Sequence, residues 1–129
     1  MNKPSFATCL NCIDGRTHIP VINWITANYP VDYVDLITEP GMAGVVGGSP
    51  KPLKQQILKK VEVSLAKHKS KHIFIVAHHD CKGNPVSDEK QKTQLTSAVA
   101  KIRDIYPSKK IEALWLDKSG GVHSVYKEQ

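Results

Sequence analysis

The sequence has few cysteines, few aromatic residues and no long apolar run, and each shortage excludes a class of protein. Its three cysteines are an odd number, which does not suit the paired disulfide framework of a small secreted domain. No apolar run approaches the roughly 20 residues that cross a membrane. The first ten residues, MNKPSFATCL, lack the apolar stretch of a secretory signal. We therefore expect a cytoplasmic protein with no membrane partner.

Acidic residues are also scarce relative to basic ones. The chain has 12 Asp and Glu against 18 Lys and Arg, which gives a formal net charge of +6. A basic balance permits nucleic-acid binding, but aromatic residues make up only 6% and no recognition motif accompanies the lysines. Most lysines fall where a helix would face solvent. We expect a solvated basic surface, or attraction of a small anion, and no nucleic-acid partner.

The remaining composition is typical of a globular chain. Apolar residues make up 40% and charged residues 23%, so wholesale disorder is not expected. A chain of 129 residues can bury one hydrophobic core but not two, and it contains no internal repeat. We predict that residues 1–129 form a single domain.

Short apolar runs alternate with amphipathic segments along the chain. The runs that predict strands are residues 6–10 (ending near Cys12), 33–38, 72–77, 111–116 and 122–126. Three segments predict helices. The first starts near Pro20 and ends at residues 28–30, and the second spans residues 53–68. The third starts after an N-cap at Ser87 and stops at Pro107. Between the second strand and the second helix, Gly44, Gly47, Gly48, Pro50 and Pro52 predict an irregular loop.

This order of elements predicts an α/β fold. Strands and helices that alternate form a parallel sheet with helices on both faces. The connection between the second and third strands is long enough to cross the sheet again, so the simplest strand order is 2-1-3-4. Gly120 and Gly121 turn the chain into a fifth strand, which we expect to pair antiparallel at the sheet edge.

Two short segments carry the chemistry, and each follows the end of a predicted strand. Residues 12–16 read Cys-Ile-Asp-Gly-Arg, and residues 78–81 read His-His-Asp-Cys. In a 2-1-3-4 sheet the first and third strands are neighbours, and their carboxyl ends border the point where open α/β sheets bind ligands. The fold therefore brings Cys12, His78 and Cys81 together. Two thiolates and one imidazole favour zinc in a tetrahedral site.

The acidic and basic residues beside Cys12 fit the same site. Three protein ligands leave a fourth position for water or for a carboxylate. Asp14 lies two residues after Cys12 and can occupy or guard that position. Arg16 can hold the Asp14 carboxylate through two hydrogen bonds and keep it ionised.

The pattern C-x-D-x-R followed by H-x-x-C resembles the β-class carbonic anhydrases. The similarity extends beyond the two motifs, to a helix and strand before H-x-x-C and to a closing pair of strands. These further segments are residues 61–66, 71–76 and 115–122. The resemblance covers most of the chain, from about residue 8 to residue 126.

The resemblance implies a function and a role for each site residue. It implies that Cys12, His78 and Cys81 bind zinc, and that Asp14 and Arg16 are the catalytic Asp–Arg pair, with Asp14 as a possible fourth ligand. The implied reaction is the reversible hydration of carbon dioxide to bicarbonate by zinc-bound hydroxide.

The resemblance also implies a proton route and an assembly. The proton released in hydration must reach solvent, and His79 or His18 can relay it. The family resemblance implies a homodimer or a larger oligomer built from dimers. It further implies that the single domain at residues 1–129 is a zinc-binding domain of the β-carbonic-anhydrase type.

The sequence departs from the family pattern in three places. It is short, and we expect it to lack the N-terminal helical arm that wraps a partner subunit. Residues 38–44 read Thr-Glu-Pro-Gly-Met-Ala-Gly, where the family has an Arg-Asn-Ala-Gly stretch. Lys82 stands where the family has a glycine after its last ligand. The chain therefore resembles a short, divergent member with an altered pocket wall.

Three alternatives remain open at this stage. Cys9 and Cys12 form a C-x-x-C, which in another context is a redox dithiol. Cys9 can instead replace another ligand in a purely structural zinc site with no open position, which makes the chain a binding protein without hydratase activity. The third alternative is a hydrolase that acts on a different small electrophile.

Overall fold

A five-stranded sheet forms the centre of the protein, in a computed structural model that describes residues 3–127. Its strands are β1 (Phe6–Cys12), β2 (Tyr33–Glu39), β3 (His72–His78), β4 (Lys110–Leu116) and β5 (Val122–Lys127). They lie in the order β2-β1-β3-β4-β5. The first four run parallel, and β5 pairs antiparallel with β4. The predicted α/β class, strand order and antiparallel edge strand are confirmed.

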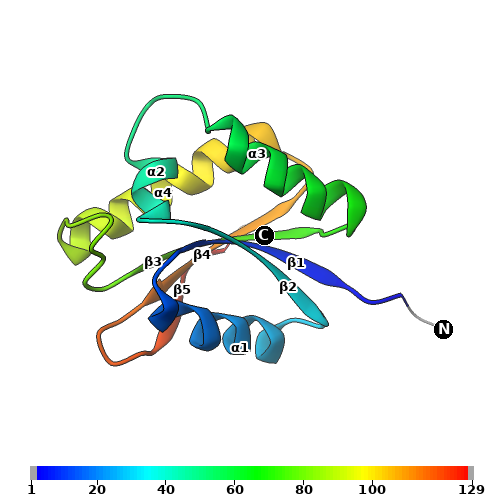
Figure 1. Ribbon diagram of the computed structural model, residues 1–129, viewed down its shortest axis with the longest axis horizontal. Helices are drawn as coiled ribbons and strands as arrows, with labels where there is room; N and C mark the ends of the chain where they lie inside the picture. Colours follow the sequence, from blue (N-terminus) through cyan, green and yellow to red (C-terminus); the bar gives the residue numbers. More distant parts are fainter. Residues whose placement is uncertain (1–2, 128–129) are drawn as a thin grey trace.

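Helices cover both faces of the sheet, as expected (Figure 1). Helix α1 (His18–Asn28) lies on one face, and α2 (Met42–Gly47), α3 (Gln55–Glu62) and α4 (Asp88–Ile105) lie on the other. A smaller core, which includes Cys9, Ile25 and Phe74, fills the space under α1. A larger core lies between the sheet and the other three helices. The carboxyl ends of β1 and β3 therefore open at one end of this layered structure.

Local sequence signals set several of the boundaries. The Ser87 side chain accepts a hydrogen bond from the Lys90 backbone N–H at 3.1 Å, so it caps α4 as predicted. Helix α1 begins at His18, so Pro20 lies in its first turn, where a proline ring is tolerated. Residues 73–78 of β3 are all buried, as expected for an interior parallel strand covered on both faces.

The predicted loop around Gly44 and Gly47 was wrong, because residues 42–47 form the short helix α2. Two glycines in six residues oppose helix formation in isolation. Tertiary packing overrides that preference, since the side chains of Met42, Ala43 and Val46 are at most 2% exposed. This helix places the chain after β2 against α4 and against the carboxyl end of the sheet.

The helix predicted over residues 53–68 is also different in detail. The α-helix ends at Glu62 and continues as a π-helical turn, Val63–Lys67. In this wider turn the Ser64 hydroxyl is buried and donates to Asp35 Oδ2 at 2.7 Å, and it lies 2.6 Å from the Thr8 hydroxyl. Apolar residues at every fourth position predict a continuous helix, and this spacing carries no signal for a single π-helical turn at its end.

Gly47 should tolerate no side chain. A Cβ at this position would overlap the Gln94 carbonyl oxygen and lie 2.9 Å from the Ala98 backbone nitrogen. We expect Gly47→Ala to lower the free energy of unfolding by about 2–3 kcal/mol, because α2 and α4 must move apart. At Gly15, by contrast, no atom lies within 4 Å of an added Cβ. Urea denaturation of both variants checks this, and an equal loss in Gly15→Ala would contradict it.

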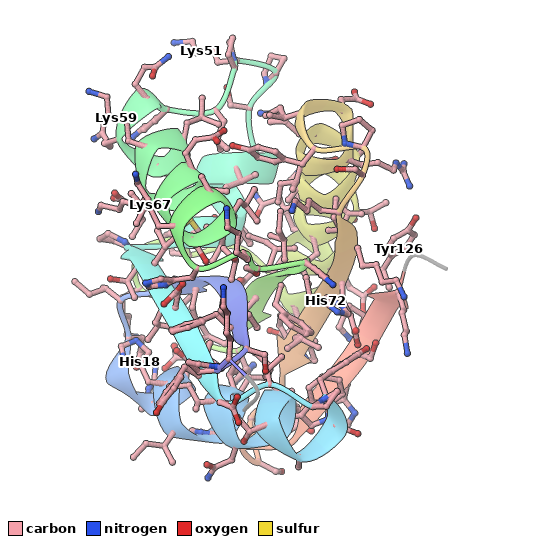
Figure 2. The ribbon with its side chains drawn as sticks, turned by 90° about the vertical axis from the view of Figure 1, so that its right-hand side faces the viewer. His18, Lys51, Lys59, Lys67, His72 and Tyr126 are labelled. Atoms are coloured by element: carbon pink, nitrogen blue, oxygen red, sulfur yellow. The ribbon has the colours of Figure 1, made fainter. Side chains whose placement is uncertain are left out.

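The surface lysines mostly face solvent, as predicted. Figure 2 shows Lys51, Lys59 and Lys67 pointing outward from the α3 side of the molecule, and all three are exposed. Among the described residues, 3–127, no helix is long and apolar enough to cross a membrane. The prediction of one domain over residues 1–129 stays a prediction, and residues 1, 2, 128 and 129 lie outside the described range.

Candidate metal centre

The fold brings Cys12, His78 and Cys81 into one buried cluster. Cys12 is the last residue of β1, His78 is the last residue of β3, and Cys81 follows three residues later. Their ligand atoms all lie within 4.8 Å of one another, and the Cys12 and Cys81 sulfurs are 3.8 Å apart. All three residues are at most 5% exposed. The neighbouring strand ends thus assemble a Cys-His-Cys donor set.

The hydrogen bonds of His78 leave one ring nitrogen ready to bind a metal. Its Nδ1 lies 2.9 Å from the His79 carbonyl oxygen, which can only accept, so Nδ1 carries the proton. The other nitrogen, Nε2, is buried and has no hydrogen-bond partner. An orphaned imidazole lone pair beside two thiols is costly unless a cation binds there. These three donors fit the soft, tetrahedral preference of zinc.

Backbone groups support the two sulfurs. The Gly41 N–H donates to Cys12 Sγ at 3.4 Å. Burial and the nearby Cys12 sulfur raise the pKa of the Cys81 thiol, and hydrogen bonds from the Gly83 and Asn84 backbone oppose that rise. Two close sulfurs resist joint ionisation without a cation, and a bound divalent ion removes that penalty.

Asp14 and Arg16 form a tight pair beside the cluster. Arg16 Nη2 donates to Asp14 Oδ2 at 2.6 Å and Arg16 Nε donates to Asp14 Oδ1 at 3.1 Å, which makes the contact bidentate. The hydrogen bond from the Arg16 side chain lowers the pKa of Asp14 to about 2. Asp14 is not part of the three-residue donor cluster among the described residues. In this structure the carboxylate is therefore held by the Arg16 side chain and by the Arg16 backbone N–H, which donates to Oδ1 at 2.9 Å.

Asp80 is a further partner that sequence reasoning missed. Arg16 Nη2 also donates to the Asp80 carbonyl oxygen at 3.1 Å, and the two side chains form an ion pair at 3.6 Å. Asp80 has a φ of 57°, an uncommon backbone conformation outside glycine that Asp tolerates better than most residues. Lys82, which is 85% exposed, pairs with Asp80 at 3.2 Å. Arg16 thereby links the loop after β1 to the loop after β3.

A cavity of about 280 Å³ opens beside His78. Arg16 and His79 line it together with Leu116 at the end of β4 and residues 117–120 of the turn that follows. His79 Nδ1 lies 3.0 Å from the Asp88 carboxylate. His18 is placed differently, because its Nε2 donates to the Cys12 carbonyl oxygen at 3.0 Å and it does not line this cavity. The two predicted relay residues are therefore not equivalent.

Cys9 lies on the other side of the sheet from the cluster. Side chains three positions apart on a strand point to opposite faces. Cys9 is fully buried in the core under α1, where burial raises its pKa to about 12, and it is not part of the donor cluster. This geometry opposes both alternatives that pair Cys9 with Cys12, the redox dithiol and the closed zinc site.

Two glycines that the sequence did not single out fix the loops around the cluster. Gly41 has a φ of 62°, and a Cβ there would lie 2.5 Å from the Gly83 carbonyl oxygen. A Cβ on Gly83 would lie 2.8 Å from the Gly41 nitrogen. The loop after β2 therefore meets the H-x-x-C loop backbone to backbone. The departure from the family pattern at residues 38–44 builds this contact.

Adding a methyl group at Gly41 should disturb the metal centre. We expect Gly41→Ala to weaken metal affinity by about 10- to 100-fold, because it moves both the N–H that supports Cys12 and the loop that carries Cys81. Competition with a chromophoric chelator measures the affinity. Gly15→Ala, which meets no atom within 4 Å, is the control. Unchanged affinity in Gly41→Ala would contradict this role.

The comparisons with known proteins agree with this geometry. The sequence profile of a family described as "Putative carbonic anhydrase" matches residues 2–126. No curated protein sequence matches the chain. Among solved structures, a tetrameric β-carbonic anhydrase from Sordaria macrospora is similar with a TM-score of 0.64 and 14% identity, covering 100% of this chain and 84% of that one.

Two other solved structures show the same fold. The β-carbonic anhydrase isoform I of Trichomonas vaginalis is similar with a TM-score of 0.65 and 15% identity, covering 100% of this chain and 87% of that one. The apo form of a carbon disulfide hydrolase is similar with a TM-score of 0.60 and 15% identity, covering 93% of this chain and 79% of that one. The chain therefore belongs to the "Putative carbonic anhydrase" family, as a divergent member with the β-carbonic-anhydrase fold.

Proposed function

We propose that this protein is a zinc-dependent lyase that reversibly hydrates carbon dioxide to bicarbonate. The observation that carries the proposal is the buried Cys12-His78-Cys81 cluster, whose His78 Nε2 has no protein partner. When zinc is bound by these three side chains, it supplies a Lewis acid that lowers the pKa of a coordinated water to about 7. Family membership supports the reaction type.

Asp14 and Arg16 orient the reacting water. The Asp14 carboxylate stays ionised at neutral pH because Arg16 holds its pKa at about 2. We propose that this fixed carboxylate, which already accepts from the Arg16 side chain and backbone N–H, also accepts a hydrogen bond from the water that attacks carbon dioxide. Arg16 is fixed in turn by Asp80, so the carboxylate cannot swing freely toward the metal ligands. The pair thus serves as an orienting device and leaves the fourth ligand position to water.

The cavity beside His78 supports a catalytic centre over a closed structural one. Its volume admits a molecule as small as carbon dioxide, and it reaches one of the three donor residues, since His78, Arg16 and His79 share its wall. Hydration forms one carbon–oxygen bond and releases one proton. We propose that His79 relays this proton, because Asp88 holds its Nδ1 and leaves Nε2 to pick up the proton and pass it to solvent. His18 is the less suitable relay, since its Nε2 is occupied by the Cys12 carbonyl.

Stopped-flow measurement of carbon dioxide hydration tests the proposal. The protein is prepared with about one zinc per chain, and an apo sample made with a chelator is the control. We expect hydration above the buffer rate only in the zinc-loaded sample, with a rate that rises through the pKa of the coordinated water. A folded, zinc-loaded protein that leaves the buffer rate unchanged would contradict the proposal.

We also propose that the protein assembles as a homodimer or a larger oligomer built from dimers. The similar Sordaria macrospora enzyme is tetrameric. Ile13 and Ile19, which flank the candidate site, are 58% and 71% exposed, as expected for side chains that a partner subunit covers. Light scattering at micromolar concentration checks the assembly, and a purely monomeric protein would contradict it.

A second candidate function is hydrolysis of a different small electrophile. The observations that favour it are the similarity to a carbon disulfide hydrolase and the altered wall at residues 38–44, where the Gly41 N–H donates to Cys12 Sγ. Carbon disulfide reacts with water at carbon in the same way as carbon dioxide and releases hydrogen sulfide. Sulfide release without carbon dioxide hydration would favour this candidate over the first.

A further inference from the structure

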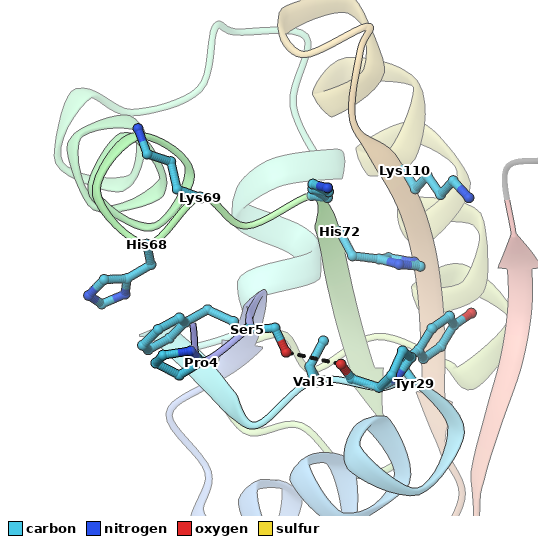
Figure 3. A pocket seen from close by; sticks show the side chains of 11 residues that line it. Pro4, Ser5, Tyr29, Val31, His68, Lys69, His72 and Lys110 are labelled. Atoms are coloured by element: carbon cyan, nitrogen blue, oxygen red, sulfur yellow. Dashed lines mark hydrogen bonds between the residues drawn. The ribbon is translucent and has the colours of Figure 1, made fainter. Parts of the chain in front are cut away.

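Another cavity lies at the end of the sheet opposite the metal centre. This cavity of about 450 Å³ lies at the amino ends of β1 and β3, whereas the cluster lies at their carboxyl ends (Figure 3). The segment between α1 and β2 closes it on one side. Its volume falls within the range of small-molecule sites. None of the side chains that the reaction requires lines it.

Two ring pairs form facing parts of its wall. Phe6 stacks on His68 with ring centroids 4.1 Å apart and an interplanar angle of 22°. Tyr29 packs edge-on against His72 with centroids 4.6 Å apart. Figure 3 shows His68 on one side of the cavity and Tyr29 on the other, with Val31 between them on its floor. The shape suits a flat, apolar group.

The charged side chains that line this cavity are lysines. Lys69, Lys71 and Lys110 line the cavity and are exposed, and no acidic residue is among the described residues that line it. Lys69 has a φ of 60°, an unusual backbone conformation for a lysine, which turns the chain directly after the π-helical turn. The exposed ammonium groups can attract an anion without desolvation, and the nearby Asp32 carboxylate is engaged by the Ser5 backbone N–H and hydroxyl.

Two carboxylates, of which Glu112 is buried and Asp35 is partly exposed, contact the rings from behind. Glu112 on β4 is 1% exposed and accepts a hydrogen bond from the Tyr29 hydroxyl. His72 Nε2 is buried and makes no hydrogen bond, with Glu112 Oε1 3.5 Å away. On the opposite wall, Asp35 Oδ2 lies 2.7 Å from His68 Nδ1. Burying the Glu112 carboxylate costs desolvation free energy. In return Glu112 positions Tyr29 and His72, as supporting residues do in a preorganised binding site.

We propose that this cavity binds a small organic anion, with a flat apolar body between the two ring pairs and a phosphate or carboxylate group at the three lysines. The apolar walls supply contact area, and the lysines supply charge complementarity. Neither the apolar walls nor the lysines alone are expected to bind the anion tightly. Exposed charges give weak attraction, and an uncharged ring gains little from the cavity without them.

Titration of nitrogen-labelled protein with phenyl phosphate, followed by amide NMR shifts, tests the proposal. Shifts are expected at residues that line the cavity, with inorganic phosphate and benzyl alcohol binding at least about tenfold more weakly, because each offers only half of the recognised chemistry. Benzoate in place of phenyl phosphate distinguishes carboxylate from phosphate preference. The readout needs no activity, so it is independent of the proposed hydratase function.

Two double variants separate the cavity from the general basic surface. Lys71→Gln/Lys110→Gln is expected to weaken phenyl phosphate binding about tenfold or more, because each lysine should contribute roughly several-fold to the affinity. Lys51→Gln/Lys59→Gln removes the same charge from positions well away from His72, as Figure 2 shows, and is expected to change affinity less than about twofold. Three results would each overturn the proposal. They are equal weakening in both double variants, binding of inorganic phosphate as tight as that of phenyl phosphate, and the absence of NMR shifts at millimolar phenyl phosphate.

Discussion

Cys81→Ser is expected to empty the metal centre, with bound zinc falling from about one per chain to less than a tenth. The serine hydroxyl is a much weaker zinc ligand than a thiolate, and the remaining pair, Cys12 and His78, cannot complete a tetrahedral site. Loss of a direct ligand should cost more than the 10- to 100-fold in affinity that a supporting group typically contributes. Metal analysis after dialysis, together with the hydration rate, measures both consequences.

Cys9→Ser is the matched control for this change. It makes the same chemical substitution at a buried cysteine, but on the opposite face of β1 and outside the donor cluster. It should keep the zinc and the rate while lowering the melting temperature, because it buries a hydroxyl in an apolar core. Loss of zinc in Cys9→Ser with retention in Cys81→Ser would move the site to the C-x-x-C and contradict the structure.

Arg16→Ala is expected to lower the carbon dioxide hydration rate by about 100-fold while leaving zinc and the fold in place. Without the guanidinium the Asp14 carboxylate keeps only the hydrogen bond from the backbone N–H of residue 16, and Oδ2 is no longer held. A misplaced orienting group costs about two orders of magnitude in related situations. Arg16 is 59% exposed and lies in the turn Gly15–Thr17, so its removal exposes no core.

Two further variants show whether Asp14 and Arg16 act as one unit. Asp14→Asn should lower the rate to a similar extent, and the double variant should be little slower than the slower single variant. Lys82→Ala is the control, since Lys82 contacts Asp80 at the same opening but not Asp14. Full activity in zinc-loaded Arg16→Ala, or strictly multiplicative losses in the double variant, would show that the pair is not a catalytic unit.

The sheet could be predicted from the sequence because its strands carry strong local signals. Residues 73–77 form an unbroken apolar run typical of a buried parallel strand, residues 111–116 are apolar except for Glu112, and the strand order follows from general rules on crossovers. Helix α2 could not be predicted in this way. Its Gly44 and Gly47 oppose helix formation locally, and its stability comes from contacts with α4, more than 40 residues later in the chain.

The donor cluster could be predicted because its residues follow two strands that the topology makes neighbours. The contacts that support the cluster could not be predicted from the sequence. Asp80 joins Arg16 through its own backbone carbonyl and an unusual φ, and Gly41 meets Gly83 through backbone atoms alone. Neither contact leaves a pattern of residue types in the sequence. The cavity at the opposite end also draws its residues from several separate segments.

Exchange of heavy oxygen between bicarbonate and water, followed by mass spectrometry at chemical equilibrium, tests the central claim most directly. It reports the interconversion of carbon dioxide and bicarbonate itself, without a net proton transfer to buffer. We predict that zinc-loaded protein accelerates the exchange, that Arg16→Ala slows it about 100-fold, and that Cys81→Ser abolishes it. Exchange at the buffer rate with one zinc bound per folded chain would contradict the assignment of this site as a carbon dioxide hydratase.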